Sequence, residues 1–329
     1  MPAYRFPVAA ALAALSILSV QFLTAPAAYA HAPQPQLSES QAGYYRLKVG
    51  AIDIIALSDG TVTLNSELLS RMPPEQVQSV LKQSYVGPLL NASVNAYLIK
   101  QGERLILVDA GTGELYGPTL NKLPASLKAV GYTPEQITDI LVTHIHTDHT
   151  GGLMDGNTRV FPNATIHVDR REVEYWLSPE KRAQAPAQMQ QYFDQAQLKF
   201  GPSVAAGKVK VFDGATELFA GIRSVPAYGH TPGHSFYVLE SLGEKIAFWG
   251  DILHVAEVQL PHPDVTIQFD VDPTAAAAAR ARAFAEAAQQ GYLIAPAHMS
   301  FPGVGHLRRD GKGYRFVPLP YLNDYYQAK

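Results

Sequence analysis

The sequence predicts a mixed α/β sandwich. Apolar runs with the residue preferences of strands alternate with amphipathic segments typical of helices along the 329 residues. Many expected strands lie close enough in sequence to form hairpins, which favours mixed sheets over a purely parallel, doubly wound sheet. A dense cluster of His and Asp follows one of these strands, at residues 144–149. Since no linker or repeat interrupts residues 43–329, we expect them to form one domain.

Turn signals and apolar runs define the elements of the N-terminal half. Gly50 divides an alternating segment into two strands, and Asp59-Gly60 is typical of a hairpin turn. Proline in a first turn and glycine after a last turn mark helix ends. The pattern predicts strands over 44–58, a helix over 73–84, strands over 91–100 and 104–108, a helix over 115–130, another helix beginning at 133–136, and strands over 139–143 and 164–168.

The C-terminal half repeats this alternation. Asp272-Pro273 is a helix cap, and Gly291 is a helix stop after an Ala-rich segment. The pattern predicts mixed helix over 171–200 with an interruption near Pro186, strands over 209–212, 222–225, 235–239 and 245–249, a helix over 274–290, a buried strand over 292–296, and an edge strand over 314–317.

The N-terminus has the features of a secretory signal peptide. Arg5 precedes an almost uncharged apolar run over residues 8–23, and Ala28-Tyr29-Ala30 offers a cleavage site. A membrane anchor is the competing interpretation, but the run is short and Pro26 follows it. We therefore expect a signal peptide over 1–30, a flexible leader over 31–42, and a periplasmic or secreted protein that does not associate with a membrane after cleavage.

Composition excludes several kinds of chemistry. The chain has no cysteine, which excludes disulfides and cysteine nucleophiles and leaves His, Asp, Glu or water as metal ligands. The net charge is −3, and no cluster of Lys and Arg stands out. Nucleic acid is therefore not expected as a partner.

Metal-ligand residues gather at the ends of apolar runs. Four occur within the run His144-Ile145-His146-Thr147-Asp148-His149. Others follow later apolar segments, and His230 lies in a Gly- and Pro-rich turn. Because a rigid sheet presents such groups together at its rim, we expect them to form one site. The seven candidate ligands are His144, His146, Asp148, His149, His230, Asp251 and His298.

Seven donors indicate two divalent metal ions, because a catalytic tetrahedral zinc uses only three protein ligands and a water. Zinc is the expected metal, and manganese, cobalt or iron would accept the same ligands. Two divalent ions, two carboxylates (one of them bridging) and a bridging hydroxide would leave a net charge of about +1, which favours binding of an ester oxygen and stabilises its oxyanion. The hydroxide is the expected nucleophile.

The order of these motifs resembles that of the metallo-β-lactamase superfamily over residues 44–318. The motifs are the H-x-H-x-D-H run, the turn Gly229-His230-Thr231-Pro232-Gly233-His234, the strand-ending Gly250-Asp251 and the late His298. The resemblance implies an αββα sandwich, two mixed sheets flanked by helices, with a binuclear site at one edge. It assigns His144, His146 and His230 to one metal, Asp148, His149 and His298 to the other, and Asp251 to the bridge.

The resemblance also implies supporting roles. Asp109 is similar to an acid that orients a ligand histidine through its ring N–H. His234 is grouped with Asp148 and Asp251 as catalytic, although lining the pocket or supporting a ligand are the alternatives for it.

Several segments are similar to methyl parathion hydrolase and its relatives, which hydrolyse lactones, aryl esters and phosphotriesters. They include residues 43–46, 56–60, 117–120, 300–306 and 311–318. The likeness implies a homodimer and a small, uncharged, hydrophobic ester substrate. Ordinary helix packing is the alternative for two of the pocket residues, Trp176 and Phe193. The implied pocket residues are Tyr116, Trp176, Phe193, Leu253, His254, Ile267 and Phe269.

The residue at position 254 distinguishes two substrate preferences among these relatives. Dedicated parathion hydrolases have Leu where this chain has His254, and they have less bulk at the places of Ile267 and Phe269. We therefore expect a hydrolase of lactones and aryl esters with secondary phosphotriesterase activity, and a dedicated organophosphate hydrolase is the alternative.

Other members of the superfamily fit less well. True metallo-β-lactamases lack a bridging Asp at position 251, and a glyoxalase II would have no reason for export. A nuclease would need a basic surface. A non-catalytic metal-binding module would have no reason to keep the full ligand set.

Overall fold

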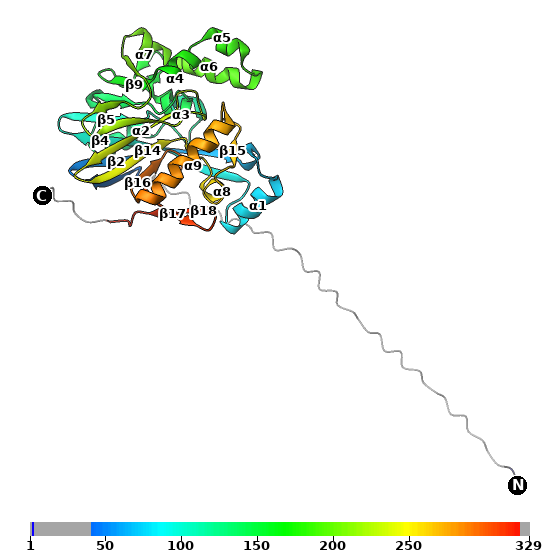
Figure 1. Cartoon of the computed structure of the whole chain (residues 1–329). Helices are drawn as coiled ribbons and strands as arrows, with labels where there is room; N and C mark the ends of the chain where they lie inside the picture. The colour runs from blue at the N-terminus through cyan, green and yellow to red at the C-terminus, as the bar shows by residue number, and fades with distance from the viewer. Residues whose placement is uncertain (1, 3–40, 323–329) are drawn as a thin grey trace. The chain divides into compact units, whose positions relative to one another are not determined.

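Two seven-stranded sheets lie face to face at the centre of the part that the structure describes, with helices on both outer faces (Figure 1). The structure is a computed structural model, and it describes residue 2 and residues 41–322. The predicted signal peptide, apart from Pro2, and the leader up to residue 40 lie outside the described residues. This arrangement confirms the predicted α/β sandwich.

The first sheet contains an antiparallel half and a parallel half. Its first four strands pair antiparallel, and the remaining pairings are parallel. In spatial order the strands are β1 (Tyr44–Val49), β2 (Ile52–Asn65), β4 (Leu89–Gln101), β5 (Arg104–Val108), β6 (Asp139–Leu141), β9 (Thr165–Asp169) and β10 (Val209–Phe212).

The second sheet is antiparallel except where β14 pairs with β16. Its strands, in spatial order, are β11 (Glu217–Phe219), β12 (Ile222–Pro226), β13 (Ser235–Ser241), β14 (Glu244–Gly250), β16 (Leu293–Pro296), β17 (Gly305–Asp310) and β18 (Gly313–Pro318). Two short antiparallel pairs lie outside these sheets: β3 (Leu69–Ser70) with β15 (Thr266–Ile267), and β7 (Met154–Asp155) with β8 (Thr158–Arg159).

The helices cover the outer faces of the sheets and the loops between them. Those that pack on the first sheet include α2, α4 and α6, whereas α9 packs on the second. The helices are α1 (Pro74–Gln83), α2 (Leu123–Ala129), α3 (Thr147–Thr150), α4 (Arg170–Trp176), α5 (Pro179–Gln184), α6 (Ala187–Lys199), α7 (Gly201–Ala205), α8 (Ala256–Gln259) and α9 (Pro273–Gln290). Among the described residues, none of these helices combines the length and the apolar character needed to cross a membrane.

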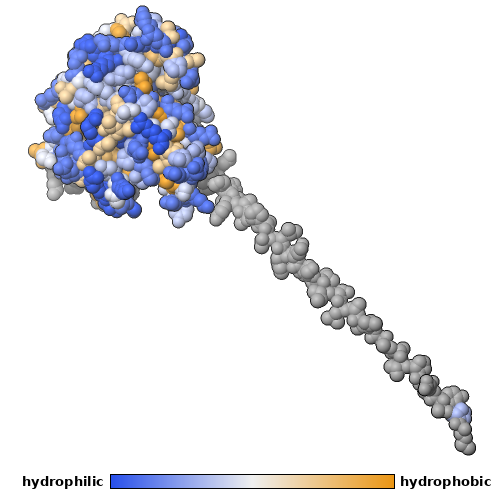
Figure 2. Space-filling model, turned by 45° about the vertical axis from the view of Figure 1, so that its right-hand side comes forward, coloured by the Kyte–Doolittle hydropathy of each residue, from blue (hydrophilic) through white to orange (hydrophobic). Residues whose placement is uncertain are grey.

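Alternation along the strands explains the layers. In β2, Ile55 and Leu57 belong to the core beneath the helices of the first sheet, whereas Ile54 and Ala56 belong to the core between the sheets. Successive strand residues point to opposite faces, so a strand that is buried on both sides reads as a continuous apolar run. On the face shown in Figure 2, hydrophobic residues form only small groups among hydrophilic ones.

The expected hairpin at Asp59-Gly60 is wrong. Strand β2 continues through these residues, and its pairing with β4 shifts between Ser58 and Gly60, as at a β-bulge. The Asp59 side chain is buried and accepts hydrogen bonds from the backbone N–H groups of Thr112 and Leu123. The Asp59 side chain, at the bulge, therefore holds the loop at Thr112 and the start of α2 in place. Strand β2 continues past the bulge towards the functional site.

Two expected helices are shorter than predicted. The helix over 115–130 begins only at Leu123, because Gly117 and Asn121 have positive φ values of 91° and 60°. The helix expected from Thr133 is one 3₁₀ turn, Pro134–Gln136, that ends where the chain becomes extended at Ile137. The other predicted elements are confirmed with small shifts of most of their ends. The structure also contains elements that were not predicted, namely the short helices α3, α7 and α8 and the strands β3, β7, β8, β11, β15 and β17.

Candidate metal centre

Strand ends from both sheets bring the seven predicted ligands together. His144 follows β6, and the short helix α3 begins directly after His146 and contains Asp148 and His149. His230 lies between β12 and β13. Asp251 follows β14, and His298 follows β16. All of these side chains except that of Asp148 are buried.

Three histidines and Asp251 form the first donor cluster. His146 Nδ1 lies 3.0 Å from His144 Nε2 and 3.1 Å from His230 Nε2. Asp251 Oδ2 lies 3.2 Å from His230 Nε2 and 3.6 Å from His144 Nε2. The ligand atoms of this group are all within 4.8 Å of one another.

The second donor cluster uses the other oxygen of the same carboxylate. Asp251 Oδ1 lies 3.1 Å from both His149 Nε2 and His298 Nε2. Asp148 Oδ2 completes the cluster, 3.3 Å from His298 Nε2 and 3.4 Å from His149 Nε2. Asp251 therefore belongs to both clusters, one oxygen in each.

These spacings fit two divalent ions. For metal–ligand bonds of 2.0–2.1 Å, the edges of a tetrahedron measure about 3.3 Å, close to the distances within each cluster. In addition, His149 Nε2 and Asp251 Oδ1 are buried and have no hydrogen-bond partner. Buried polar atoms without partners are costly, so these atoms need a ligand. The donor set is therefore suited to divalent metal ions.

Most of the ligand histidines are oriented by a hydrogen bond that they donate from the ring nitrogen facing away from the donor cluster. The ring of His149 donates from Nδ1 to Asp109 Oδ2 at 2.8 Å, where the resemblance had placed an orienting acid. The ring of His230 donates from Nδ1 to Asp270 Oδ1 at 2.9 Å. The ring of His298 donates from Nδ1 to a backbone carbonyl at 2.9 Å. Such partners fix the tautomer and direct the other nitrogen to the metal.

Burial and opposite charges govern the charge state of the metal-free centre. Burial lowers the pKa values of His144 and His146 to well below the usual range, so both rings are neutral. Burial also opposes a charge on His298, but Asp251 and Asp148 raise its pKa to about 10. Burial alone would raise the pKa of Asp251, but the surrounding rings, His298 first, hold it well below its usual value.

His234 belongs to the scaffold, which corrects its grouping as a catalytic residue. Its Nε2 accepts a hydrogen bond from the backbone N–H of Asp251 at 3.0 Å, and its Nδ1 donates to the Ala227 carbonyl at 3.2 Å. The ring is fully buried, and burial lowers its pKa to about 3. Because both nitrogens are engaged, neither can transfer a proton to a substrate or bind a metal.

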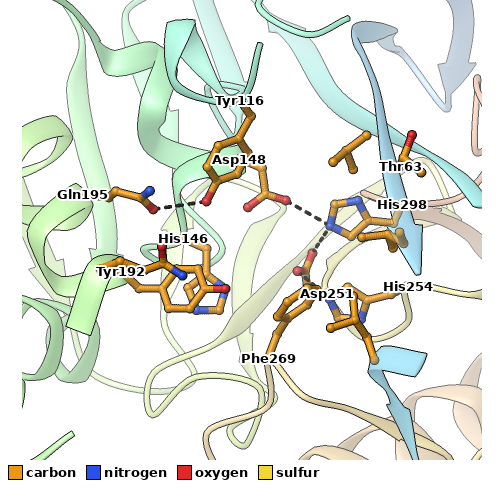
Figure 3. Close-up of a pocket in the computed structure, with 14 residues that line it drawn as sticks. Thr63, Tyr116, His146, Asp148, Tyr192, Gln195, Asp251, His254, Phe269 and His298 are labelled. Carbon is orange, nitrogen blue, oxygen red and sulfur yellow. Dashed lines mark hydrogen bonds and ion pairs between the residues drawn. The ribbon is translucent and has the colours of Figure 1, made fainter. Parts of the chain in front are cut away.

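A cavity of about 290 Å³ opens onto the two donor clusters. Figure 3 shows Asp148 and Asp251 directed at His298, with Tyr116 and Gln195 on one side and Phe269 on the other. The volume is at the small end of the range for small-molecule sites. Besides His146, Asp148, Asp251 and His298, the lining residues are Val62, Thr63, Leu64, Leu68, Tyr116, Gln191, Tyr192, Gln195, His254 and Phe269.

Three predicted pocket residues, Tyr116, His254 and Phe269, line this cavity, and four do not. Trp176 and Phe193 pack against each other at a tilted angle in the core beneath the first sheet, with ring centroids 4.8 Å apart, which agrees with the alternative of ordinary helix packing. The others are core residues of the second sheet and of the cluster around α1, namely Leu253 and Ile267.

Sequence patterns did not reveal the opposite wall of the cavity. On α6, Tyr192 and Gln195 line the cavity, whereas their neighbour Phe193 is buried in the core. Gln195 Oε1 accepts from the Tyr116 hydroxyl at 3.1 Å and from the Thr147 hydroxyl at 2.6 Å. The helix has only a weakly amphipathic pattern, so its cavity face was not distinguishable in the sequence.

The comparison with protein families agrees with this fold and site. A family model described as the Metallo-beta-lactamase superfamily matches residues 91–298. This range spans more than half of the chain, and it contains all seven candidate ligands. The chain therefore belongs to the metallo-beta-lactamase superfamily.

Two solved structures are similar to this chain over nearly their whole length. One is hydrolase AbOPH, with 36% identity and a TM-score of 0.82, covering 87% of this chain and 100% of that chain. Another is AidC, a dizinc quorum-quenching lactonase in complex with the product N-hexanoyl-L-homoserine. Its identity is 27% and its TM-score 0.79, and the match covers 85% of this chain and 99% of that chain.

Curated relatives match a shorter part. An N-acyl homoserine lactonase from Bacillus sp is 30% identical over 174 residues, which are 47% of this chain and 61% of that protein. An atrochrysone carboxyl ACP thioesterase from Passalora fulva is 30% identical over 168 residues, 51% of this chain and 40% of that protein. The chain thus spans less than two thirds of the length of these relatives.

Proposed function

We propose that the chain is a binuclear metal-dependent hydrolase of small, hydrophobic, uncharged lactones and aryl esters, with phosphotriesterase activity as a secondary property. One observation carries the proposal: Asp251 joins two donor clusters, one through each oxygen, and lines the cavity that opens onto them. When bound, two divalent ions would polarise an ester oxygen and supply an activated water. Zinc is the proposed metal, on the chemistry of the His and Asp donors and the likeness to the dizinc lactonase.

The residues of the chain hold and orient the reacting groups. Asp109 and Asp270 fix the rings of His149 and His230, so the ligand atoms keep their positions when substrate enters. Leu64 and Phe269 offer an apolar surface to a hydrophobic group of the substrate. A bound ester is thereby aligned, and water is excluded from one side of it.

The lining of the cavity favours an uncharged substrate. Among its described residues there is no lysine or arginine that would pair with an anionic group. The likeness to N-acyl homoserine lactonases supports a lactone as the first choice. His254 lines the cavity and contacts Asp251 Oδ2 through Nε2 at 2.9 Å, a polar contact that a leucine could not make. A dedicated organophosphate hydrolase is the second candidate.

The test is a panel of kcat/KM values on the metal-loaded protein. The substrates are dihydrocoumarin, an acyl-homoserine lactone, phenyl acetate, methyl paraoxon and a β-lactam. We expect one of the lactones to lead and methyl paraoxon to follow at a lower value. Asp251→Asn should lower every value by more than about 100-fold, since it disrupts both clusters.

Two results would contradict the proposal. One is a β-lactam at the head of the panel, and the other is undiminished hydrolysis of any substrate by a metal-free sample. Methyl paraoxon at the head would favour the second candidate. Location outside the cytoplasm and a homodimer remain predictions from the sequence, to be checked by cell fractionation and by light scattering.

A further inference from the structure

A buried carboxylate outside the ligand set connects the two loops that supply the first cluster. Glu172, on α4, has no exposed surface. Its Oε2 accepts a hydrogen bond from the backbone N–H of Ile145 at 2.8 Å, and its Oε1 accepts one from the backbone N–H of Gly233 at 2.6 Å. Charge-assisted hydrogen bonds of this length are strong and directional.

The two backbone donors lie in the chain segments that carry the histidines of the first cluster. Ile145 lies between His144 and His146, and Gly233 lies in the turn that carries His230. All three histidines of the first cluster are thus on backbone segments held by one side chain. Because the segments come from different sheets, the separation of the loops depends on a group that spans both.

Glu172 is closely packed against Gly233 and Trp176. A Cβ atom at residue 233 would lie 2.8 Å from the Glu172 N atom and 2.9 Å from its Cγ, so only glycine permits this approach. The indole N–H of Trp176 also donates to Glu172 Oε2, at 3.0 Å. The ring of Trp176 packs edge-on against the ring of His146, with centroids 5.0 Å apart.

We propose that Glu172 is a positioning residue that sets the separation of the two loops and thereby the geometry of the first metal position; this rests on the two-metal centre of the proposed function. A carboxylate suits the task because both of its oxygens accept hydrogen bonds. Glutamine keeps one acceptor and turns an NH₂ group towards a backbone N–H, and alanine leaves all three donors unpaired.

The experiment compares Glu172→Gln and Glu172→Ala with the unmodified chain. Zinc content is measured by mass spectrometry after equilibration with a competing chelator, and the visible spectrum of the cobalt-loaded protein reports ligand geometry. We expect about two ions per unmodified chain. In the variants, the ion at the first metal position should be lost at about 10- to 100-fold lower chelator strength, with a changed cobalt spectrum, while the ion at the second position is retained.

Asp139→Asn is the matched control. Asp139 is also a buried carboxylate, but it binds His167 and Arg104 at the end of β6 away from the ligands. Its loss should lower stability and leave both ions and the cobalt spectrum unchanged.

Each outcome decides the inference. Metal affinities and spectra in both Glu172 variants equal to those of the control would overturn it. If Glu172→Ala does not fold, Glu172→Gln carries the same test with a smaller expected loss. An unmodified chain that binds no metal would instead overturn the proposed function.

Discussion

Asp270 orients the ring of His230 as Asp109 orients that of His149, although no motif marks it in the sequence. Replacing it with Asn removes the charge that strengthens the bond to His230 Nδ1. We expect Asp270→Asn to lower zinc affinity at the first position by about 10- to 100-fold, measured by chelator competition. Asp272→Asn is the control, because the Asp272 side chain only caps α9. Equal affinities in the two variants would contradict the assignment.

The charge state of the histidines predicts how pH affects metal binding. Burial disfavours the charged forms of His298 and His230, but nearby carboxylates raise their pKa values to about 10 and about 9, so both rings hold a proton at pH 7. A metal displaces these protons, and the apparent affinity should therefore increase with pH until it levels off above about 9–10. Burial also opposes a charge on His149, but Asp251 and Asp148 raise its pKa well above the usual value, so calorimetry in buffers of different ionisation enthalpy should detect about three protons released at pH 7. No net release would show that the rings are neutral without metal.

The ligands of the centre could be predicted from the sequence, whereas its supporting residues could not. His144, His146, Asp148 and His149 are close in sequence, Asp251 and His298 follow apolar strands, and His230 lies in a Gly- and Pro-rich turn. Asp270 and Glu172 act through partners that only the folded chain brings near them. Each is an ordinary acid in the sequence, and the direction of its side chain depends on packing.

At the scale of an element, Arg280 of α9 supports the segment that leads from Asp251 to the far wall of the cavity. Its guanidinium is buried and donates to the carbonyls of Ile252 and Val265, each at 2.6 Å, and of Pro263 at 3.0 Å. Arg280→Met would leave three carbonyls without this partner.

We expect Arg280→Met to lower the free energy of unfolding by about 2 kcal/mol or more. The Ile252 and Pro263 carbonyls lose this donor, whereas Val265 keeps that of Gln259, and each buried unpaired group costs about 1–3 kcal/mol. KM should also rise, because the same segment carries His254 and Phe269. Urea denaturation and steady-state kinetics measure the two effects. Arg282→Met, an exposed position on the same helix, should change neither quantity, and a matching loss there would point to the helix itself.

Elements defined by local signals were predicted well, and those defined by distant contacts were not. Helix α9 lies where Asp272 and Gly291 marked its ends. The segment before α2 was expected to be helical, yet Gly117 and Asn121 have positive φ values, and the buried side chain of Asp59 accepts hydrogen bonds from the backbone of Thr112 and Leu123 and holds it as a loop. Such a long-range bond leaves no local pattern in the sequence.

For the whole molecule, the centre lies where the two sheets meet. His144 and His149 follow a strand of the first sheet, and Asp251 and His298 follow strands of the second. Bound ions would therefore connect the two halves of the sandwich. Chelation should lower Tm by about 10 °C, because a ligand present at 1,000 times its Kd adds about 4 kcal/mol. Calorimetry checks this value, and Asp251→Asn should show a much smaller response to chelator. An unchanged Tm in the unmodified chain would contradict it.

Because residues 144–149 contribute ligands to both metal positions, they affect the order in which the chain folds and binds metal. They supply two ligands to each position, His144 and His146 to one and Asp148 and His149 to the other. An unfolded chain therefore offers each ion only half of a site, and the missing halves come from the last third of the sequence. The ions cannot direct the early pairing of the strands. They bind strongly only after the sheets have come together, so metal loading reports completion of the fold.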